Sequence, residues 1–181
     1  MNTEVAKETT NGTATAVQIA ICQPARHQTG IAELIVPIQQ QEFNIPITFE
    51  DQPDLRQIES FYQHGKGNFW VALDGDKVVG SIALLDIGND QAALRKMFVH
   101  PEYRGRERGV AAALLATLIA WSREQQLEEI YLGTTSAFLA AHRFYEKHGF
   151  LRIEPEALPE RFPVMQVDTC FYALSLAEGQ D

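Results

Sequence analysis

The residues best suited to chemistry lie in one run, from Arg95 to Ala111, which reads RKMFVHPEYRGRERGVA. The residue types predict the end of a strand, a turn that contains Gly105 and Gly109, and the start of a helix. A helix N-terminus presents unpaired backbone N–H groups and the positive end of the helix dipole, and both favour a phosphate group. The run also holds five cations, which are Arg95, Lys96, Arg104, Arg106 and Arg108.

This local charge opposes the sign of the whole chain, whose 181 residues carry a formal net charge of −9. Cations gathered against the overall sign are what an anion site needs. Glycine is nevertheless common where a strand turns into a helix, and a run of arginines is commonly a solvated surface. Spacing alone therefore supports an anion site and a solvated turn about equally. The run matches neither a Walker A loop nor the Gly-x-Gly-x-x-Gly dinucleotide fingerprint.

The elements that must position this run alternate in a way that predicts one mixed α/β domain with helices on both faces of a mixed sheet. Pro37 is expected to weaken or kink the first helix, Ser136 to cap the last helix, and Gly149 to end it. A tight turn is expected at 74–76. Residues 1–16 read as a flexible polar tail before a single domain at 17–181. The expected strands are 17–21, 68–73, 77–85, 92–99, 129–133 and 168–176, and the expected helices are 30–41, 53–64, 109–125 and 136–148.

Composition excludes several classes of protein. The acidic balance argues against non-specific nucleic-acid binding, which depends on Lys and Arg. Cys22 and Cys170 have no metal-ligand spacing, so we expect two thiols in a reducing compartment and no metal site. Neither a bilayer-spanning stretch nor the apolar core of a signal peptide is found, so the expected location is the cytoplasm, with no membrane partner.

The run resembles motif A of the GNAT N-acetyltransferases, whose core is Gln/Arg-x-x-Gly-x-Gly/Ala after a strand that reads apolar-x-Val-x-Pro. RERGVA at 106–111 fits the core, and MFVHP at 97–101 fits the strand. AHRFYEKHGF at 141–150 is similar to the second signature of the family, Ala-x-x-Phe-Tyr-x-Lys-x-Gly-Phe. Two signatures in the right order, about forty residues apart, form a specific match. The resemblance extends over about nine-tenths of the chain.

The resemblance implies a fold and a cosubstrate. The fold is a mixed, mostly antiparallel sheet, splayed between its fourth and fifth strands. Acetyl-CoA would insert its pantetheine arm there and pair with main-chain groups of Met97, Phe98 and Val99. Its pyrophosphate would lie on the backbone N–H groups of the turn and helix start, with Arg104 and Arg106 as the side chains that balance its charge. The implied pyrophosphate site comprises Arg104, Arg106, Glu107, Arg108, Gly109, Val110 and Ala111.

The implied reaction is N-acetylation by direct attack of a neutral amine on the thioester carbonyl. A backbone N–H at the end of the Val99 strand would stabilise the oxyanion. Tyr145 matches the usual general acid of the family, because a phenol with a pKa of roughly 10 can protonate the departing sulfur. The alternative for Tyr145 is a core aromatic residue. Phe138 stands where many relatives have a cofactor-contacting Asn, and it suggests an apolar wall instead.

The general base and the acceptor stay open. Some relatives carry a carboxylate on the strand equivalent to 91–99, but this strand offers only Arg95 and Lys96. Glu50, Asp51, His100 and Asp168 are candidates only through their expected place near the mouth of the site. The acceptor would lie between the segments 42–51 and 158–172, as a small-molecule or peptide amine. A non-catalytic acyl-CoA-binding or sensing module is the rival function, and a homodimer stays open.

Overall fold

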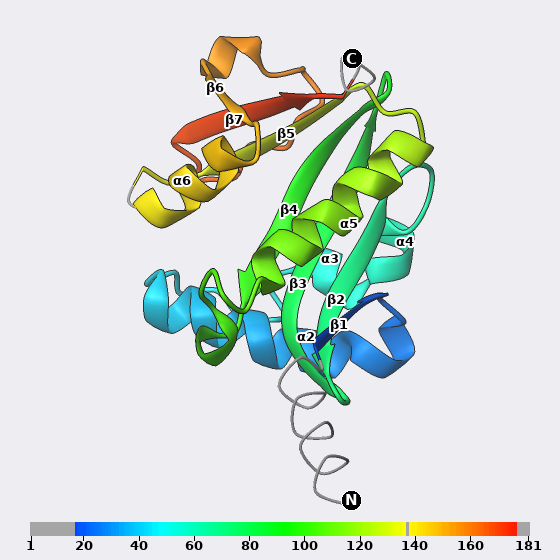
Figure 1. The fold of residues 1–181 in the computed structure, drawn as a ribbon, viewed down its shortest axis with the longest axis vertical. Coiled ribbons are helices and arrows are strands. Elements are labelled where there is room, and N and C mark those ends of the chain that lie inside the picture. The colour runs from blue at the N-terminus through cyan, green and yellow to red at the C-terminus, as the bar shows by residue number, and fades with distance from the viewer. Residues whose placement is uncertain (1–16, 137, 177–181) are drawn as a thin grey trace, which may run out of the picture.

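The structure, a computed structural model, describes residues 17–136 and 138–176. The expected tail at 1–16 lies outside this part of the chain. One sheet of seven strands has the order β1-β2-β3-β4-β5-β7-β6, and every described pair is antiparallel except β4 with β5 (Figure 1). The strands are β1 (Val17–Ile21), β2 (Asn68–Asp74), β3 (Lys77–Gly88), β4 (Gln91–Val99), β5 (Glu129–Thr134), β6 (Leu151–Ile153) and β7 (Cys170–Ser175).

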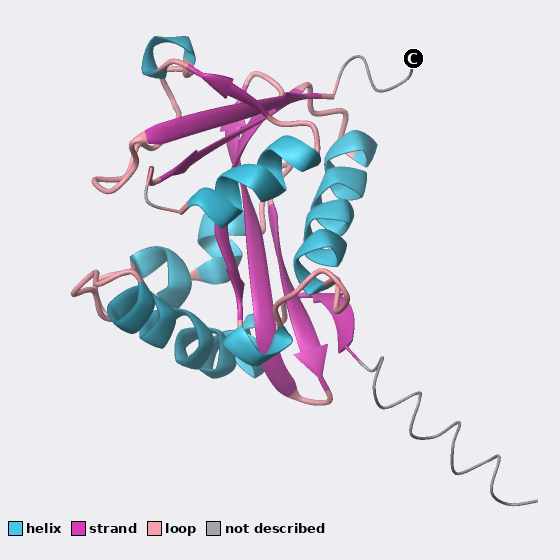
Figure 2. Ribbon diagram, turned by 60° about the vertical axis from the view of Figure 1, so that its left-hand side comes forward, coloured by secondary structure: helices cyan, strands magenta, loops and turns pink. Residues whose placement is uncertain are grey.

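Helices cover both faces of this sheet, as Figures 1 and 2 show. The first face packs on α2 (Pro24–Pro37), α3 (Pro53–Arg56) and α4 (Ile58–Tyr62). The second packs on α5 (Val110–Glu124) and α6 (Leu139–Lys147). The predicted mixed sheet with helices on both faces is therefore confirmed. None of the helices in the described ranges is long and apolar enough to cross a membrane.

Pro37 is expected to weaken or kink its helix, and in the structure the α-helix ends at this residue without a kink being needed. The helix begins earlier than predicted, at Pro24, and Pro37 is its last residue. Proline has no N–H to continue the α-helical ladder. The chain goes on as a π-helical turn, Ile38–Glu42, and the N–H of Phe43 donates to the carbonyl of Ile38 at 3.1 Å. This wider turn carries the chain toward the loop that precedes α3.

Two other helix predictions were wrong in detail. The single helix expected at 53–64 is two short helices, because the backbone of Gln57 leaves the helical region with φ −134° and ψ 56°. Ser136 does not cap α6, which begins at Leu139, and the N–H of Ser136 instead donates to Thr169 Oγ1 at 2.8 Å. The expected stop at Gly149 is confirmed by its φ of +97°.

The sheet divides between β4 and β5. Only the first residues of β4 pair with β5, and the last pair is Ala93 with Tyr131. Beyond it β5 continues along β7, so β5 and β7 turn away from β4 (Figure 1). We call the unpaired parts of the two strands, 94–99 of β4 and 132–134 of β5, the wedge. The wedge confirms the predicted opening between the fourth and fifth strands.

A β-bulge in β4 lies at the inner end of the wedge. Ala83 faces Arg95 and Ser81 faces Phe98, so three steps along β4 match two along β3. The extra residue is accommodated by Lys96, whose φ of +55° is unusual for a residue with a side chain. The hydroxyl of Ser81, which is fully buried, donates to the Lys96 carbonyl at 2.7 Å. This hydrogen bond ties the bulge to the neighbouring strand.

We expect Ser81→Ala to lower the free energy of unfolding by about 1 kcal/mol or more, because it removes this buried hydrogen bond. Urea unfolding followed by circular dichroism measures the change. Thr117→Ala is the matched control, since the Thr117 hydroxyl also donates to a backbone carbonyl, that of Ala113 at 2.8 Å, but on an exposed helix face. Equal destabilisation by the two substitutions would show that the bulge does not depend on Ser81.

Candidate functional site at the β4–β5 wedge

The turn between β4 and α5 presents free backbone donors. The pyrophosphate is predicted to lie on the backbone N–H groups of residues 106–111, and those of Arg108 and Gly109 already donate to the Gly105 carbonyl, at 3.1 and 3.2 Å. The first donor of the α5 ladder is Ala113, which bonds to the carbonyl of Gly109 at 2.9 Å. The turn therefore offers the N–H groups of residues 106, 107, 110 and 111, which donate to no described residue.

Gly109 shapes this donor-rich surface. It adopts φ +67° as the residue before α5, and it provides no side-chain cap. A Cβ built on Gly109 would have no atom within 4 Å, so the space above its backbone is open. A helix N-terminus with an open backbone and unpaired N–H groups fits a phosphate group.

The three arginines of the turn have different surroundings. Arg104 is already paired, because its Nη1 lies 2.9 Å from Glu42 Oε1 and its Nε donates to the Val99 carbonyl at 2.8 Å. Arg108 lies over the ring of Tyr103, 4.9 Å from its centroid. Arg106 is exposed and bonds to no described residue. Among the three side chains, Arg106 is therefore the freest to meet a phosphate.

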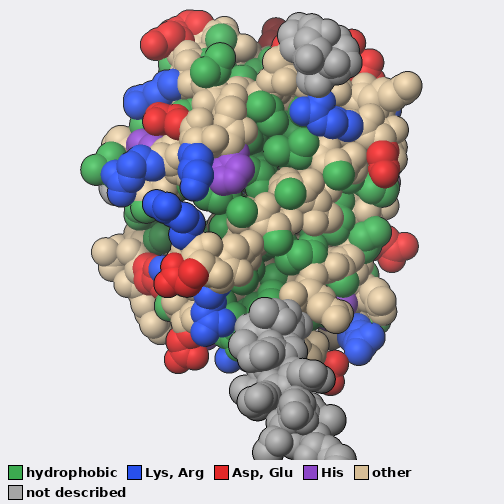
Figure 3. Space-filling model, in the orientation of Figure 1, with side chains coloured by type: hydrophobic (Ala, Val, Ile, Leu, Met, Phe, Trp, Pro, Cys, Tyr) green, Lys and Arg blue, Asp and Glu red, His purple; other side chains and the backbone are tan. Residues whose placement is uncertain are grey.

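Cationic side chains also gather around this turn on the surface. Figure 3 shows Lys and Arg clustered over α6 and over the turn before α5. The exposed cations on these segments are Arg104, Arg106, Arg108, Arg143 and Lys147. Their concentration in a chain of net charge −9 favours an anionic ligand on this side of the molecule.

The edge of β4 inside the wedge is open. Phe98 and Val99 pair with Ser81 and Gly80 of β3, and no residue of β4 beyond Ala93 pairs with β5. An open strand edge can add an extended ligand through main-chain hydrogen bonds. Met97, Phe98 and Val99, the predicted pantetheine contacts, all lie on this edge.

Phe138 contributes to an aromatic bridge. Its ring lies 4.2 Å from that of Phe43, which lies 6.0 Å from that of Phe98. These rings join β4, the end of the π-helical turn and the residue before α6. Phe138 therefore provides an apolar surface, as its residue type suggests.

Tyr145 of α6 packs in the core cluster that also contains Val99 and Val110. It is 7% exposed, and burial raises its pKa well above the usual value. Every fully buried side-chain nitrogen or oxygen in the described ranges has a hydrogen-bond partner, whereas the Tyr145 hydroxyl bonds to no described residue. The hydroxyl therefore keeps a small contact with solvent. A neutral phenol with no acceptor in the described part of the chain can donate its proton to a ligand.

The four candidate bases have different environments. Glu50 and Asp51 are exposed, and Asp51 Oδ2 accepts from the Thr48 N–H at 3.1 Å. His100 Nδ1 accepts from the Glu102 N–H at 3.1 Å. Glu50, Asp51 and His100 thus behave as surface or capping residues.

Asp168 differs from the other candidates because it lies against the wedge. A Cβ on Gly133 of β5 would lie 2.5 Å from Asp168 Oδ2, so the carboxylate covers the backbone of Gly133. Burial raises the Asp168 pKa, while the Met165 N–H, which donates to Oδ2 at 2.9 Å, and the charge of Arg95 oppose the rise. A half-buried carboxylate with a raised pKa fits a general base.

A buried charged cluster faces α3 and α4. The bulge turns consecutive residues, Arg95 and Lys96, toward the same carboxylate, that of Asp54, at 3.9 and 3.3 Å. Lys96 Nζ also donates to Gln52 Oε1 at 2.8 Å, and the Tyr62 hydroxyl donates to Asp54 Oδ2 at 2.6 Å. Burial lowers the Lys96 pKa, and Asp54 opposes this change. Sequence reasoning missed this cluster, because no local spacing indicates the bulge that creates it.

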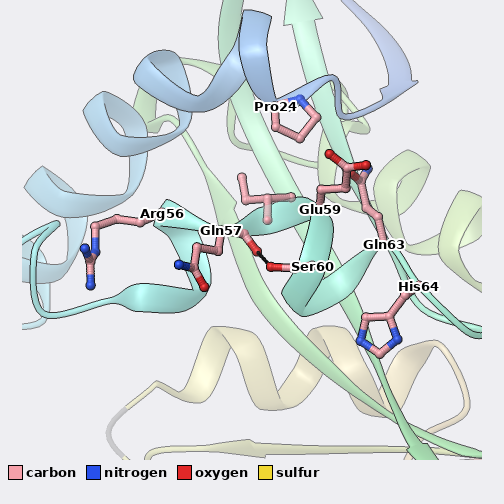
Figure 4. Close-up of a pocket in the computed structure, with 8 residues that line it drawn as sticks. Pro24, Arg56, Gln57, Glu59, Ser60, Gln63 and His64 are labelled. Carbon is pink, nitrogen blue, oxygen red and sulfur yellow. Dashed lines mark hydrogen bonds between the residues drawn. The ribbon is translucent and has the colours of Figure 1, made fainter.

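An open hollow elsewhere does not coincide with the wedge. It measures about 640 Å³ and is lined by Pro24, Gln63, His64 and neighbours of α3 and α4 (Figure 4). None of its lining residues belongs to β4, β5 or the turn before α5. We therefore place the candidate site at the wedge, which combines the open strand edge with the free N–H groups of the turn. Tyr145 shares a core cluster with Val99 and Val110, which lie on either side of this turn. In the described ranges no cluster of His, Cys, Asp or Glu could hold a metal ion.

Comparison with known proteins identifies the family. The model of the acetyltransferase (GNAT) family matches residues 32–150. The chain belongs to the GNAT acetyltransferase family. It is 38% identical to a GNAT acetyltransferase from Staphylococcus aureus Mu50, with a TM-score of 0.82 over 88% of this chain and 99% of that one.

The fold is also similar to that of a solved structure at lower identity, and the sequence is similar to that of a curated protein. A putative acetyltransferase from Salmonella typhimurium, determined with its cofactor acetyl-CoA, has a TM-score of 0.70 at 22% identity and covers 90% of this chain and 95% of that one. N-acetylaspartate synthetase of Xenopus tropicalis is 37% identical over 102 residues, which are 55% of this chain and 37% of that protein. The chain thus spans less than half the length of this curated relative. Membership of the GNAT acetyltransferase family supports acetyl transfer as the general activity.

If the turn holds the pyrophosphate of CoA, Gly109→Ala should weaken CoA binding by about tenfold or more, because the new methyl group would occupy the open space above the backbone. Isothermal titration calorimetry with CoA measures the change. Gly75→Ala is the matched control, since Gly75 has φ +61°, also has no atom within 4 Å of an added Cβ, and lies in the β2–β3 turn. Both substitutions carry a similar backbone strain of roughly 1–2 kcal/mol. Equal effects on CoA affinity would argue against phosphate binding at Gly109.

Proposed function

We propose that this GNAT protein transfers the acetyl group of acetyl-CoA to a primary amine of a small molecule or a peptide. The proposal is supported by an unpaired β4 edge beside a donor-rich turn, and by a Tyr145 hydroxyl that has no acceptor among the described residues and shares a core cluster with Val99 and Val110. Each of these features matches one part of acetyl-CoA: the pantetheine arm, the pyrophosphate and the sulfur.

The cosubstrate is held mostly by main-chain groups in this proposal. Met97, Phe98 and Val99 pair with the pantetheine arm along the open edge of β4. The free N–H groups of residues 106, 107, 110 and 111 hold the pyrophosphate, and Arg106 adds charge. Arg104 acts indirectly, because its bonds to Glu42 and to the Val99 carbonyl fix the turn against β4.

Two side chains move the protons. A neutral amine attacks the thioester carbonyl, Asp168 accepts the proton that the amine loses, and Tyr145 protonates the departing sulfur. Gly133, which Asp168 covers, shares its sheet face with Tyr131, whereas Tyr145 packs with the core on the opposite face. The base and the acid therefore approach the wedge from opposite faces of the sheet, so neither blocks the other.

Location and organisation are also proposals. We propose one domain over 17–181, in the cytoplasm. The two cysteines are unpaired and buried, which is the usual state of thiols in a reducing compartment.

A screen of amines with acetyl-CoA tests the function. Release of free thiol reports turnover, and mass spectrometry of the products separates small amines from peptides. The similarity to an N-acetylaspartate synthetase makes amino acids a natural part of the panel. Tight CoA binding with no turnover on any amine would favour the non-catalytic CoA-binding module.

We expect Tyr145→Phe to lower kcat by about 100-fold or more, with little change in CoA affinity, because it removes the proton donor and keeps the ring. Steady-state kinetics and CoA titration separate these effects. Tyr131→Phe is the control: Tyr131 is also 7% exposed, but its hydroxyl is bonded to Glu129 Oε1 at 2.9 Å. An unchanged kcat in Tyr145→Phe would remove Tyr145 from the mechanism.

We expect the activity to fall on acidification at a higher pH than an ordinary carboxyl group would give, because burial raises the Asp168 pKa and the base must be deprotonated. The decrease forms the acid limb of the profile of kcat/KM against pH, which measures it. Asp168→Asn should lower kcat by about 100-fold and abolish the limb, whereas Asp51→Asn, at an exposed capping position, should retain it. A limb that survives in Asp168→Asn would assign the base to another group.

A further inference from the structure

Arg95 has an unusual environment for a guanidinium group. Its side chain is only 13% exposed, yet its closest carboxylate oxygen, on Asp54, lies 3.9 Å away, beyond hydrogen-bond distance. Its one hydrogen bond to a described residue goes from Nη2 to the weakly accepting Sδ of Met165, at 3.5 Å. The Phe61 ring lies 5.8 Å from the guanidinium carbon. A largely buried guanidinium normally has oxygen acceptors, because burial without them is costly.

Neither of the nearby carboxylates, Asp54 and Asp168, forms a close ion pair with the Arg95 guanidinium. Asp54 is already engaged by Lys96, at 3.3 Å, and by the Tyr62 hydroxyl, at 2.6 Å. Asp168 influences Arg95 through its charge but forms no ion pair with it within 4.0 Å. Arg95 thus keeps donors available for a ligand.

The strand register places Arg95 at the inner end of the wedge. Ala93 and Tyr131 form the last β4–β5 pair and pack in one cluster on the first sheet face. Because side chains alternate along a strand, the next positions on this face are Arg95 of β4 and Gly133 of β5. Asp168 covers Gly133. A cation and a carboxylate therefore flank the inner end of the wedge on the same face.

We propose that Arg95 binds a carboxylate of the acceptor, so that the acceptor is an amine that also carries a carboxylate, as an amino acid does. The proposal rests on the proposed acetyl transfer and specifies its substrate. The planar guanidinium pairs with the carboxylate through two N–H donors, and the amine lies toward Asp168. Lys96 acts as a positioning residue, because its contact with Asp54 keeps that carboxylate from neutralising Arg95.

Binding measured without turnover tests this proposal. Isothermal titration calorimetry on CoA-saturated protein compares aspartate, glutamate and alanine with their fully amidated counterparts. We expect each free acid to bind at least about tenfold more tightly than its amide. In Arg95→Gln the affinity for the acids should fall about 30-fold, while the affinity for the amides should change less than about twofold. Arg95→Lys should bind the acids more tightly than Arg95→Gln but less tightly than the wild type. Lysine keeps the positive charge but lacks the paired N–H donors of the guanidinium.

Controls separate binding from folding. The affinity for CoA and the midpoint of thermal unfolding should be retained in Arg95→Gln. Arg26→Gln, which removes an exposed arginine paired with Asp76, should bind the acids as the wild type does.

Three outcomes would overturn the proposal: amides that bind as tightly as acids, an acid preference that survives in Arg95→Gln, or no binding by any acid of the panel. Failure of the proposed function gives a different result. Acids would then bind in an Arg95-dependent manner without forming an acetylated product. Conversely, efficient acetylation of amines without a carboxylate preference would keep the proposed function and reject the role of Arg95.

Discussion

The β-bulge at Lys96 is the constraint on which the site depends. A regular strand would send Arg95 and Lys96 to opposite faces of the sheet. The extra residue, with φ +55° at Lys96, turns both cations toward α3, and the buried Ser81 hydroxyl holds the bulge through the Lys96 carbonyl. The bulge begins two residues beyond the last β4–β5 pair, where the sheet opens. One local irregularity thus changes the direction of side chains at the point where a ligand can meet the open strand edge.

Electrostatics separates the two ends of the wedge. At the outer end, the exposed cations and the N–H groups that donate to no described residue face solvent. Folding does not remove water from these groups, and they can bind a large anion. At the inner end, the charges of Arg95, Lys96 and Asp54 are largely buried, and each side chain has neighbours that fix its direction. Lys96 has both an ionic and an amide partner, whereas Arg95 has neither within hydrogen-bond distance. Among the described residues, this difference is the basis of the proposal that a ligand supplies the partner of Arg95.

Much of the architecture followed from local signals. Apolar runs predicted every described strand except the three-residue β6, Gly149 ended the last helix, and the two GNAT signatures indicated the opening between β4 and β5. Short-range signals were less reliable where tertiary contacts compete with them. The helix expected at 53–64 breaks at Gln57, and the Asp54 carboxylate is buried against residues of β4. Ser136, a suitable cap by residue type, instead bonds to Thr169 beside β7.

The sequence by itself determined the family, the order of most elements and the glycine-containing turn before the helix at 110–124, because each depends on residues close together in the chain. Only the tertiary structure decided which side chains share the wedge. Arg95 and Asp168 are far apart in sequence, and their common face follows from strand register, the bulge and the loop before β7. The same holds for Arg104, because its ion-pair partner Glu42 is far away in the sequence, at the end of the π-helical turn. Contacts between side chains of different helices and strands depend on how these elements pack, and the spacing of residues along the chain does not specify them.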